Sequence, residues 1–500
     1  MHAPNLLLHT LLFSLCSAIP VEDTSSLVRR ADVPNLPPAS PPNANDCSFR
    51  TFTQNIDHFG QHNGTFQQKY NLVTEFFKPG GPIFFFQGEE STYLDCVEST
   101  IGYSWAKQTH GIAVSLEHRY FGESAPFNST DPTKQQYEYS FLTLDNVMAD
   151  SANFVNYLKK SISGASNSKA IVYSGSYGGF LCTVLRQNHP EAFYGAIASA
   201  PPAAGIGSDP NSEDWYTWNI WLNNVYQDAS AEGSSKLKNA IQTLEQRVTS
   251  GTNLSSLQHE LNLCDEPKTT DFVAINNWFQ NVLSSAAELN YPIARPGRSP
   301  VAHPLNKVMT IALTEKDPIQ IINQTLSLWF GSVYPCIDVN SQTALQAVVP
   351  AIQVSVFNYL CCKYYPLFAL SDVPNGTIFT ASSLGKYEVA QCDKKYNITT
   401  PSIPSLREKY KFTRADLRNS THIIWSLGQY DPTNGVSPHQ PGIDSPALSV
   451  DRNVSRILYT SNMGHREDLF APDPSDRETV TKARSIELES IKGWLGWYGL

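Results

Sequence analysis

The chain has 500 residues, and Asp and Glu together outnumber Lys and Arg by 46 to 36, which gives a formal net charge of −10. This length exceeds the usual size of one hydrophobic core and predicts either one large domain with an insertion or two domains. An acidic chain without basic runs is not expected to bind nucleic acid or an anionic membrane.

The first 30 residues have the features of a targeting segment. Residues 6–15 form an apolar stretch that is too short to cross a bilayer, and Cys16-Ser17-Ala18 offers the small residues that signal peptidase accepts. We therefore predict a signal peptide over residues 1–18. Arg29-Arg30 forms a dibasic processing site, so a pro-segment is expected over residues 19–30.

Sequons and cysteines favour the same secretory route. Some of the eight cysteines beyond Cys16 should be bridged in an oxidising compartment, although their spacing leaves the pairing open. Cys182 is expected to be a buried free thiol instead. The predicted location is extracellular, with a vacuolar or lysosome-like compartment as the alternative. Eight Asn-x-Ser/Thr tripeptides predict N-linked glycosylation at Asn63, Asn128, Asn253, Asn323, Asn375, Asn397, Asn419 and Asn453.

Residues 31–213 alternate short apolar runs with helical patterns. Apolar residues recur on one face of the segment 144–158, which predicts an amphipathic helix. Strands that alternate with helices form parallel sheets with right-handed crossovers, so we predict the first part of an α/β domain here. The predicted buried strands are Pro82–Phe86, Ile112–Leu116, Ala170–Tyr173 and Ala196–Ala198.

The third of these strands runs into the sequence Ser174-Gly175-Ser176-Tyr177-Gly178-Gly179, which an apolar helical pattern follows. This arrangement is typical of a nucleophile elbow, although Ser174 replaces the first glycine of the usual pattern. Such a turn exposes the Ser176 oxygen and directs the Tyr177 N–H toward an oxyanion. The alternative is an ordinary Gly/Ser turn between a strand and a helix.

A second oxyanion donor is expected in the loop after the first predicted strand, where Gly88 lets the backbone approach a substrate carbonyl closely. The alternative reading of Gly88 is an ordinary turn at the end of a strand.

Residues 214–410 lose the alternation and carry helical patterns, among them 235–248 and 270–289. Strands then resume at residues 422–425 and 457–459, and a final helix is predicted over 479–497. A sheet that is interrupted by helices and then completed over residues 411–500 predicts an α/β-hydrolase fold with a large, mainly helical cap domain inserted at 214–410.

Two late residues complete a catalytic triad on this fold. The carboxylate and the histidine of an α/β-hydrolase follow the serine in chain order, each on a loop after a strand. Asp431 and His465 meet both conditions, whereas His58 precedes the serine. Locally, Asp431 could be an Asp-Pro turn and His465 a surface histidine. Neither C-x-x-C nor H-E-x-x-H occurs, so no metal or other cofactor is expected.

Several blocks of the sequence together resemble the serine peptidase family of lysosomal Pro-X carboxypeptidase, dipeptidyl peptidase II and the secreted acid prolyl endopeptidases of filamentous fungi. The resemblance extends from about Phe52 to the last predicted helix. The Glu117-to-Ser124 block is the most specific, and Arg119 within it is expected to join carboxylates in a structural network. The blocks lie at residues 52–59, 65–66, 81–86, 117–124, 171–179, 428–432 and 464–469.

The resemblance implies a capped α/β-hydrolase that uses Ser176, Asp431 and His465 to cut peptide bonds after proline or small residues. Proline-containing peptides are the expected partners, and the oligomeric state is not indicated. Glu89 and Glu90 are implied to bind substrate, but their loop matches the exopeptidase pattern only loosely. The choice between exopeptidase and endopeptidase therefore stays open.

Two further positions depart from the family pattern. Arg466 stands where a second histidine is common, and Thr433 stands where a tryptophan is common. The elbow and the order of the triad would also suit a carboxylesterase or lipase, which is the alternative function.

Overall fold

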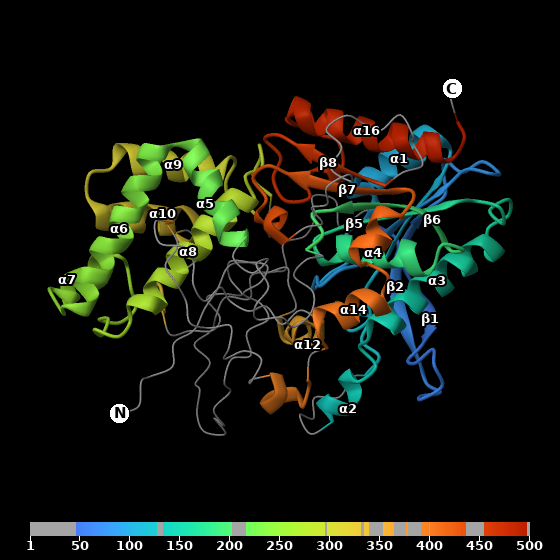
Figure 1. The fold of residues 1–500 in the computed structure, drawn as a ribbon, viewed down its shortest axis with the longest axis horizontal. Helices are drawn as coiled ribbons and strands as arrows, with labels where there is room; N and C mark the ends of the chain where they lie inside the picture. Colours follow the sequence, from blue (N-terminus) through green and yellow to red (C-terminus); the bar gives the residue numbers. More distant parts are fainter. Residues whose placement is uncertain are drawn as a thin grey trace. The chain divides into compact units, whose positions relative to one another are not determined.

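The sheet of this protein is mixed, and its strands are numbered in chain order in Figure 1. The computed structural model describes residues 47–127, 134–202, 217–295, 298–331, 335–339, 354–364, 377–378, 392–399, 401–436 and 455–497. The predicted signal peptide and pro-segment lie outside these residues.

Eight strands form one sheet with the order β1-β2-β4-β3-β5-β6-β7-β8. The strands β1, β2 and β4 pair antiparallel, and every pair from β4 through β3 to β8 is parallel. The strand bounds are Phe49–Asn55 for β1, Thr65–Val73 for β2, Ile83–Gln87 for β3, Ile112–Leu116 for β4, Ala170–Gly175 for β5, Phe193–Ser199 for β6, Ile423–Gly428 for β7 and Arg456–Thr460 for β8.

The predicted strands correspond to β3 through β8, and the α/β-hydrolase fold is confirmed by these parallel strands together with the strand–turn–helix at Ser176. The antiparallel pair β1 and β2 was not among the predicted strands. Its residues alternate between exposed and covered positions, which gives a weaker apolar signal than the continuously buried β3 and β4.

Helices cover both faces of the sheet, as Figure 1 shows, and the side chains of β3 alternate between the two layers. Phe84 belongs to a buried cluster with Trp105 of α1 and Trp494 of α16. Phe85 points the other way and contacts Phe154 of α3. The main helices of these layers are α1 (Ile101–Thr109), α3 (Leu144–Ser161), α4 (Tyr177–Asn188) and α16 (Glu478–Trp494).

In the described part of the chain, six shorter helical elements lie between the strands and the long helices of the sheet. Among them, α15 begins with a capping box in which Thr413 and Asp416 cap each other's backbone N–H groups. They are η2 (Val97–Ser99), α2 (Gln135–Tyr139), α14 (Ile403–Lys409), α15 (Arg414–Arg418), η5 (Pro432–Val436) and η6 (Glu467–Leu469).

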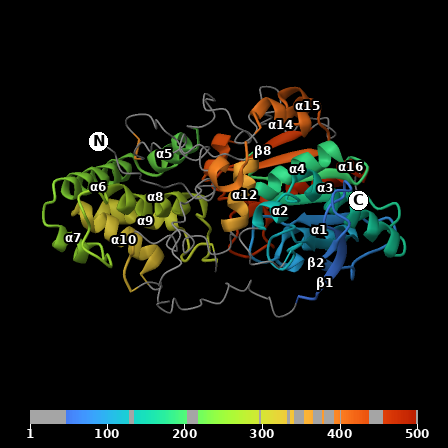
Figure 2. The same cartoon turned by 90° about the horizontal axis from the view of Figure 1, so that it is seen from below.

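The chain divides into two compact units, which we call the sheet unit and the helical unit. The sheet unit comprises residues 41–209, 287–293 and 401–500, and the helical unit comprises 1–40, 210–286 and 294–400. Most helices of the helical unit gather in one bundle, which Figure 2 shows from below. The helices of the bundle are α5 (Thr217–Ala229), α6 (Ala231–Thr249), α7 (Leu254–Glu260), α8 (Phe272–Glu288, whose end belongs to the sheet unit), α9 (Pro304–Thr314) and α10 (Pro318–Phe330). The same unit also contains α12 (Val354–Tyr364), which is not part of the bundle.

Disulfides occur in both units. Cys47–Cys96 ties the start of the described chain to the segment before η2, and the helical unit contains Cys264–Cys336 and Cys362–Cys392. Cys182 on α4 is buried and free, as predicted. Among the described residues, the one group of side chains that could hold a metal is Cys47, Cys96 and Glu98, but its cysteines are already joined to each other.

The asparagines of the predicted glycosylation sites differ in their exposure to solvent. Asn63, Asn253, Asn397 and Asn419 are exposed, while Asn323 is half-buried within α10. Three others, Asn128, Asn375 and Asn453, lie outside the described residues. No helix within the described ranges combines the length and the apolar character that a membrane span requires.

Candidate active site

Ser176 occupies a strained turn between β5 and α4. Its φ of 58° and ψ of −131° lie outside the regions that non-glycine residues normally populate, and such a conformation costs about 1–3 kcal/mol. The Ser176 N–H donates to the Ser199 carbonyl at 2.9 Å, which holds the turn against the end of β6. A buried serine with φ above zero at a strand–helix junction is the geometry of a nucleophile elbow.

Small residues are required around this turn. A side chain at Gly179 would place its Cβ 2.4 Å from the Ser199 carbonyl oxygen, and one at Gly178 would meet the Ser174 hydroxyl at 2.1 Å. Ser174 itself has a function at the position where a glycine is usual. Its Oγ donates to the Gln87 carbonyl at 2.7 Å and so ties the elbow to the end of β3.

Asp431 and His465 are hydrogen-bonded to each other in the same unit. Asp431 follows β7, His465 follows β8, and the distance from His465 Nδ1 to Asp431 Oδ2 is 2.8 Å. Both side chains are buried. The second carboxylate oxygen of Asp431 accepts the Thr433 N–H at 2.9 Å, so Thr433 orients the carboxylate through its backbone.

The elbow lies against the loop that carries His465. A Cβ on Gly175 would be 2.8 Å from the Cβ of Arg466, which directly follows the histidine. The Ser176 hydroxyl has no hydrogen-bond partner within the described part of the chain. Hydrogen bonds between catalytic groups are often loose before substrate binds, so the missing bond does not count against Ser176 as the predicted nucleophile.

Arg466 and Glu89 form a buried ion pair that links the histidine loop to the loop after β3. The neighbouring Glu90 is also buried. Burial, reinforced by repulsion from Glu89, raises the pKa of Glu90 to about 8. Glu89 is therefore held by Arg466 and Glu90 is a neutral acid near pH 7, while the role of both in substrate binding remains a prediction.

The pKa of His465 reflects opposing influences. Burial favours the neutral imidazole and lowers the pKa, but the charge and hydrogen bond of Asp431, together with the Glu288 carboxylate, outweigh it, so the net pKa lies above its ordinary value. Glu288 acts in the same direction as Asp431, and its Oε1 is 3.8 Å from His465 Nε2. The sequence contained no signal for Glu288, because it lies in the predicted insertion and in no recognisable motif.

The two predicted oxyanion donors differ in their surroundings. Tyr177 is the first residue of α4, so its N–H lies at the positive end of the helix dipole. The Gly88 N–H, in contrast, donates to the Leu116 carbonyl at 2.8 Å, in line with the β3–β4 ladder. The Gly88 amide is therefore already used within the sheet, and a second donor from the Gly88 loop stays a prediction. The lack of a side chain at Gly88 permits close packing, since a Cβ would lie 2.4 Å from the Leu116 oxygen.

The Glu117-to-Ser124 block contacts the elbow through His118 and contains a buried ion pair. Arg119 is fully buried and bidentate, and its Nε and Nη2 each lie 2.6 Å from an oxygen of Asp150 on α3. His58 joins the same carboxylate at 2.8 Å, so it is part of this network. His118 Nε2 lies 3.1 Å from the Tyr177 hydroxyl. The structural network expected around Arg119 is present, with Asp150 as its carboxylate.

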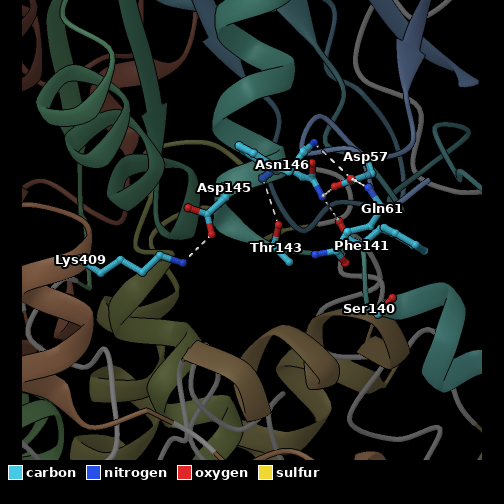
Figure 3. Close-up of a pocket in the computed structure, with 9 residues that line it drawn as sticks. Asp57, Gln61, Ser140, Phe141, Thr143, Asp145, Asn146 and Lys409 are labelled. Carbon is cyan, nitrogen blue, oxygen red and sulfur yellow. Dashed lines mark hydrogen bonds and ion pairs between the residues drawn. The ribbon is translucent and has the colours of Figure 1, made fainter. Parts of the chain in front are cut away.

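A cavity of about 310 Å³ opens elsewhere in the sheet unit, and Figure 3 shows its lining. None of the predicted catalytic residues lines it. Its polar groups bind one another: Asn146 donates to Asp57 at 3.2 Å, and Lys409 pairs with Asp145 at 2.6 Å. We therefore assign no catalytic role to this cavity.

Comparison with known proteins identifies the chain's relatives. Bovine lysosomal Pro-X carboxypeptidase is 28% identical over 468 residues, which cover 90% of this chain and 88% of that protein. The human protein of the same name is 26% identical over 483 residues, with 93% and 91% covered. A putative serine protease of Caenorhabditis elegans, K12H4.7, is 30% identical over 471 residues, with 89% and 88% covered.

The family comparison agrees with these relatives and with the resemblance found in the sequence. Residues 54–487 match the family described as serine carboxypeptidase S28. Since that match spans most of the chain, the protein is a serine-type peptidase and belongs to the serine carboxypeptidase S28 family.

Proposed function

We propose that this protein is a secreted exopeptidase of the carboxypeptidase type that hydrolyses the peptide bond after a proline, with Ser176, His465 and Asp431 as its catalytic residues. The observation that carries the proposal is the buried 2.8 Å hydrogen bond between His465 and Asp431 on a loop that packs against the Ser176 elbow. The proline preference is taken from the relatives, which are named Pro-X carboxypeptidases.

The reaction follows from the roles of these groups. His465 Nε2 takes the Ser176 proton while the serine oxygen attacks the carbonyl carbon of the scissile bond. Asp431 accepts a hydrogen bond from the Nδ1–H without taking the proton, and it stabilises the imidazolium that forms. The imidazolium then protonates the leaving amine, the peptide C–N bond breaks, and water activated by the same histidine hydrolyses the acyl-enzyme.

The developing oxyanion needs two donors. The Tyr177 N–H at the start of α4 supplies the first, and the positive end of the helix dipole strengthens it. The second comes from the Gly88–Glu90 loop, although not from the Gly88 amide, which already donates to Leu116. The bond from Ser174 to the Gln87 carbonyl keeps this loop beside the elbow.

Proline is a suitable specificity residue for a rigid pocket, because its ring fixes φ and its imide nitrogen carries no N–H when it lies within a peptide. Secretion is supported by the sequons that are exposed, of which Asn63 and Asn419 lie in the sheet unit. Glycan mapping of these two asparagines by mass spectrometry tests the secretory route.

Cleavage-site profiling of a peptide library by mass spectrometry tests the proposed activity. We expect release of single carboxyl-terminal residues that follow proline, and loss of this release in Ser176→Ala. Cleavage within blocked peptides would make the enzyme an endopeptidase. Turnover of short acyl esters without any peptide cleavage would contradict the proposal and favour an esterase.

A further inference from the structure

Residues 287–293 belong to the sheet unit, although the residues on both sides of them in the sequence belong to the helical unit. This segment holds the histidine loop through its backbone and one tyrosine. The His465 N–H donates to the Glu288 carbonyl at 2.7 Å, and the Tyr291 hydroxyl donates to the His465 carbonyl at 2.9 Å. Both peptide groups of His465 are thus fixed by residues that are remote in sequence.

The same segment brings a second carboxylate to the imidazole. Glu288 Oε1 lies 3.8 Å from His465 Nε2, while Asp431 Oδ2 lies 2.8 Å from Nδ1. All three side chains are buried. The imidazole therefore has one acidic group on each of its nitrogens, and Glu288 is on the nitrogen that must accept the serine proton.

We propose that Glu288 is a positioning residue that sets the basicity of His465, and hence the pH at which the peptidase becomes active. The inference rests on the proposed function, because it assigns His465 as the general base. At 3.8 Å the contact is longer than a hydrogen bond, so Nε2 stays available to Ser176. The carboxylate acts through charge: it stabilises the imidazolium and does nothing comparable for the neutral ring.

The other charged groups around His465 do not cancel this effect. Asp431 raises the pKa of His465, as Glu288 does, while Arg466 lowers it. The charge of Arg466 is largely offset by its ion pair with Glu89. Glu90, whose own pKa responds to His465, is protonated below about pH 8 and carries no charge in the acidic range.

The charge of Glu288 moves the active pH range of the enzyme upward. A general base works only when it is neutral, so stabilising the imidazolium moves the acid side of the pH–rate profile to higher pH. The same stabilisation favours the imidazolium of the transition state. Glu288 thus strengthens the base at the expense of activity in acid.

The test compares Glu288→Gln with the wild-type full-length enzyme in kcat/KM against pH on a peptide that ends in Pro-Phe. The midpoint of the acid limb should move to lower pH by roughly 1 unit or more, since an opposite charge within 4–6 Å moves a pKa by about 1–3 units. The plateau kcat should fall, because a less basic imidazole is a weaker proton acceptor. Glu489→Gln removes an exposed carboxylate of the same unit and should leave the acid limb in place.

Two further variants separate charge from loop anchoring. Tyr291→Phe removes the hydrogen bond to the His465 carbonyl without changing charge, so it should lower kcat without moving the acid limb. Glu288→Asp keeps the charge but draws it back by one methylene, so its acid limb should lie between those of wild type and Glu288→Gln. If Glu288→Gln does not fold, Glu288→Asp decides the question.

The outcomes distinguish this inference from the proposed function. An acid limb at the wild-type position in Glu288→Gln, or in Glu288→Asp when only that variant folds, would overturn the role of Glu288. A shift of equal size in Tyr291→Phe would also overturn it. Peptidase activity that survives in Ser176→Ala would instead refute the catalytic assignment itself.

Discussion

Replacement of Asp431 by asparagine should inactivate the enzyme through the tautomer of His465. The structure fixes which way the new amide would point. The Thr433 N–H donates to Asp431 Oδ1 at 2.9 Å, so the amide oxygen of an asparagine would take that place. Its NH₂ group would then face His465 Nδ1, where the carboxylate oxygen now lies at 2.8 Å.

An NH₂ donor at this position requires Nδ1 to accept, so the single proton of the neutral ring moves to Nε2. A ring protonated on Nε2 cannot take the Ser176 proton. Loss of the correct tautomer costs about 10⁴ in kcat, which corresponds to about 5.4 kcal/mol of activation free energy. The folded structure should persist, because the substitution preserves the volume of the buried side chain.

Steady-state kinetics on a peptide ending in Pro-Phe, with melting temperature as the measure of folding, would check this expectation. Asp393→Asn, which neutralises an exposed aspartate, is the control and should retain the wild-type rate. A folded Asp431→Asn enzyme within about tenfold of the wild-type kcat would refute the reasoning, because so small a loss is inconsistent with the wrong tautomer.

Two predictions concern stability. Gly179→Ala gains about 1 kcal/mol of helix propensity, but its Cβ would lie 2.4 Å from the Ser199 backbone oxygen, which cannot move aside. We expect a net loss of about 1–2 kcal/mol in the free energy of unfolding, and a urea titration that shows a gain would contradict the packing argument. Glu90 keeps its proton to about pH 8 when folded but only to its ordinary value of 4.5 when unfolded, so its contribution to stability declines as pH rises from 4.5 to 8. Glu90→Gln should therefore raise the melting temperature at pH 7.5 relative to wild type and change it little at pH 4, and equal effects at both pH values would argue against a buried neutral acid.

The sequence predicted the parallel half of the fold because its strands are continuous apolar runs. Both faces of β3 and β4 are buried, so their residues are apolar without interruption. The strand β1 reads Phe-Arg-Thr-Phe-Thr-Gln-Asn and has mostly exposed or half-exposed side chains. Its place in the sheet depends on pairing with β2, which single-segment patterns do not encode.

Some residues of the candidate site could be predicted from the sequence, and others only from the fold. Ser176, Asp431 and His465 could be named because chain order and placement after strands restrict the choice. Glu288 could not be predicted, since its approach to His465 depends on residues 287–293 joining the sheet unit. The use of the Gly88 amide by Leu116 is likewise a matter of strand pairing, which a turn motif does not reveal.

The departures from the family pattern became interpretable only with the structure. Arg466, in place of the common second histidine, pairs with Glu89 of a loop that lies far away in sequence. Thr433, in place of the common tryptophan, contributes a backbone N–H that any residue except proline could supply. The second substitution is therefore neutral for the orientation of Asp431.

The proposed mechanism depends most directly on Ser176 as the nucleophile. Incubation of the wild-type enzyme with a fluorophosphonate, followed by peptide mapping in a mass spectrometer, measures which residue is covalently modified. We predict one adduct on Ser176, with loss of peptidase activity in proportion to labelling and no adduct in His465→Ala. An adduct on a different serine that tracks inactivation, or full activity in enzyme labelled at Ser176, would contradict the account.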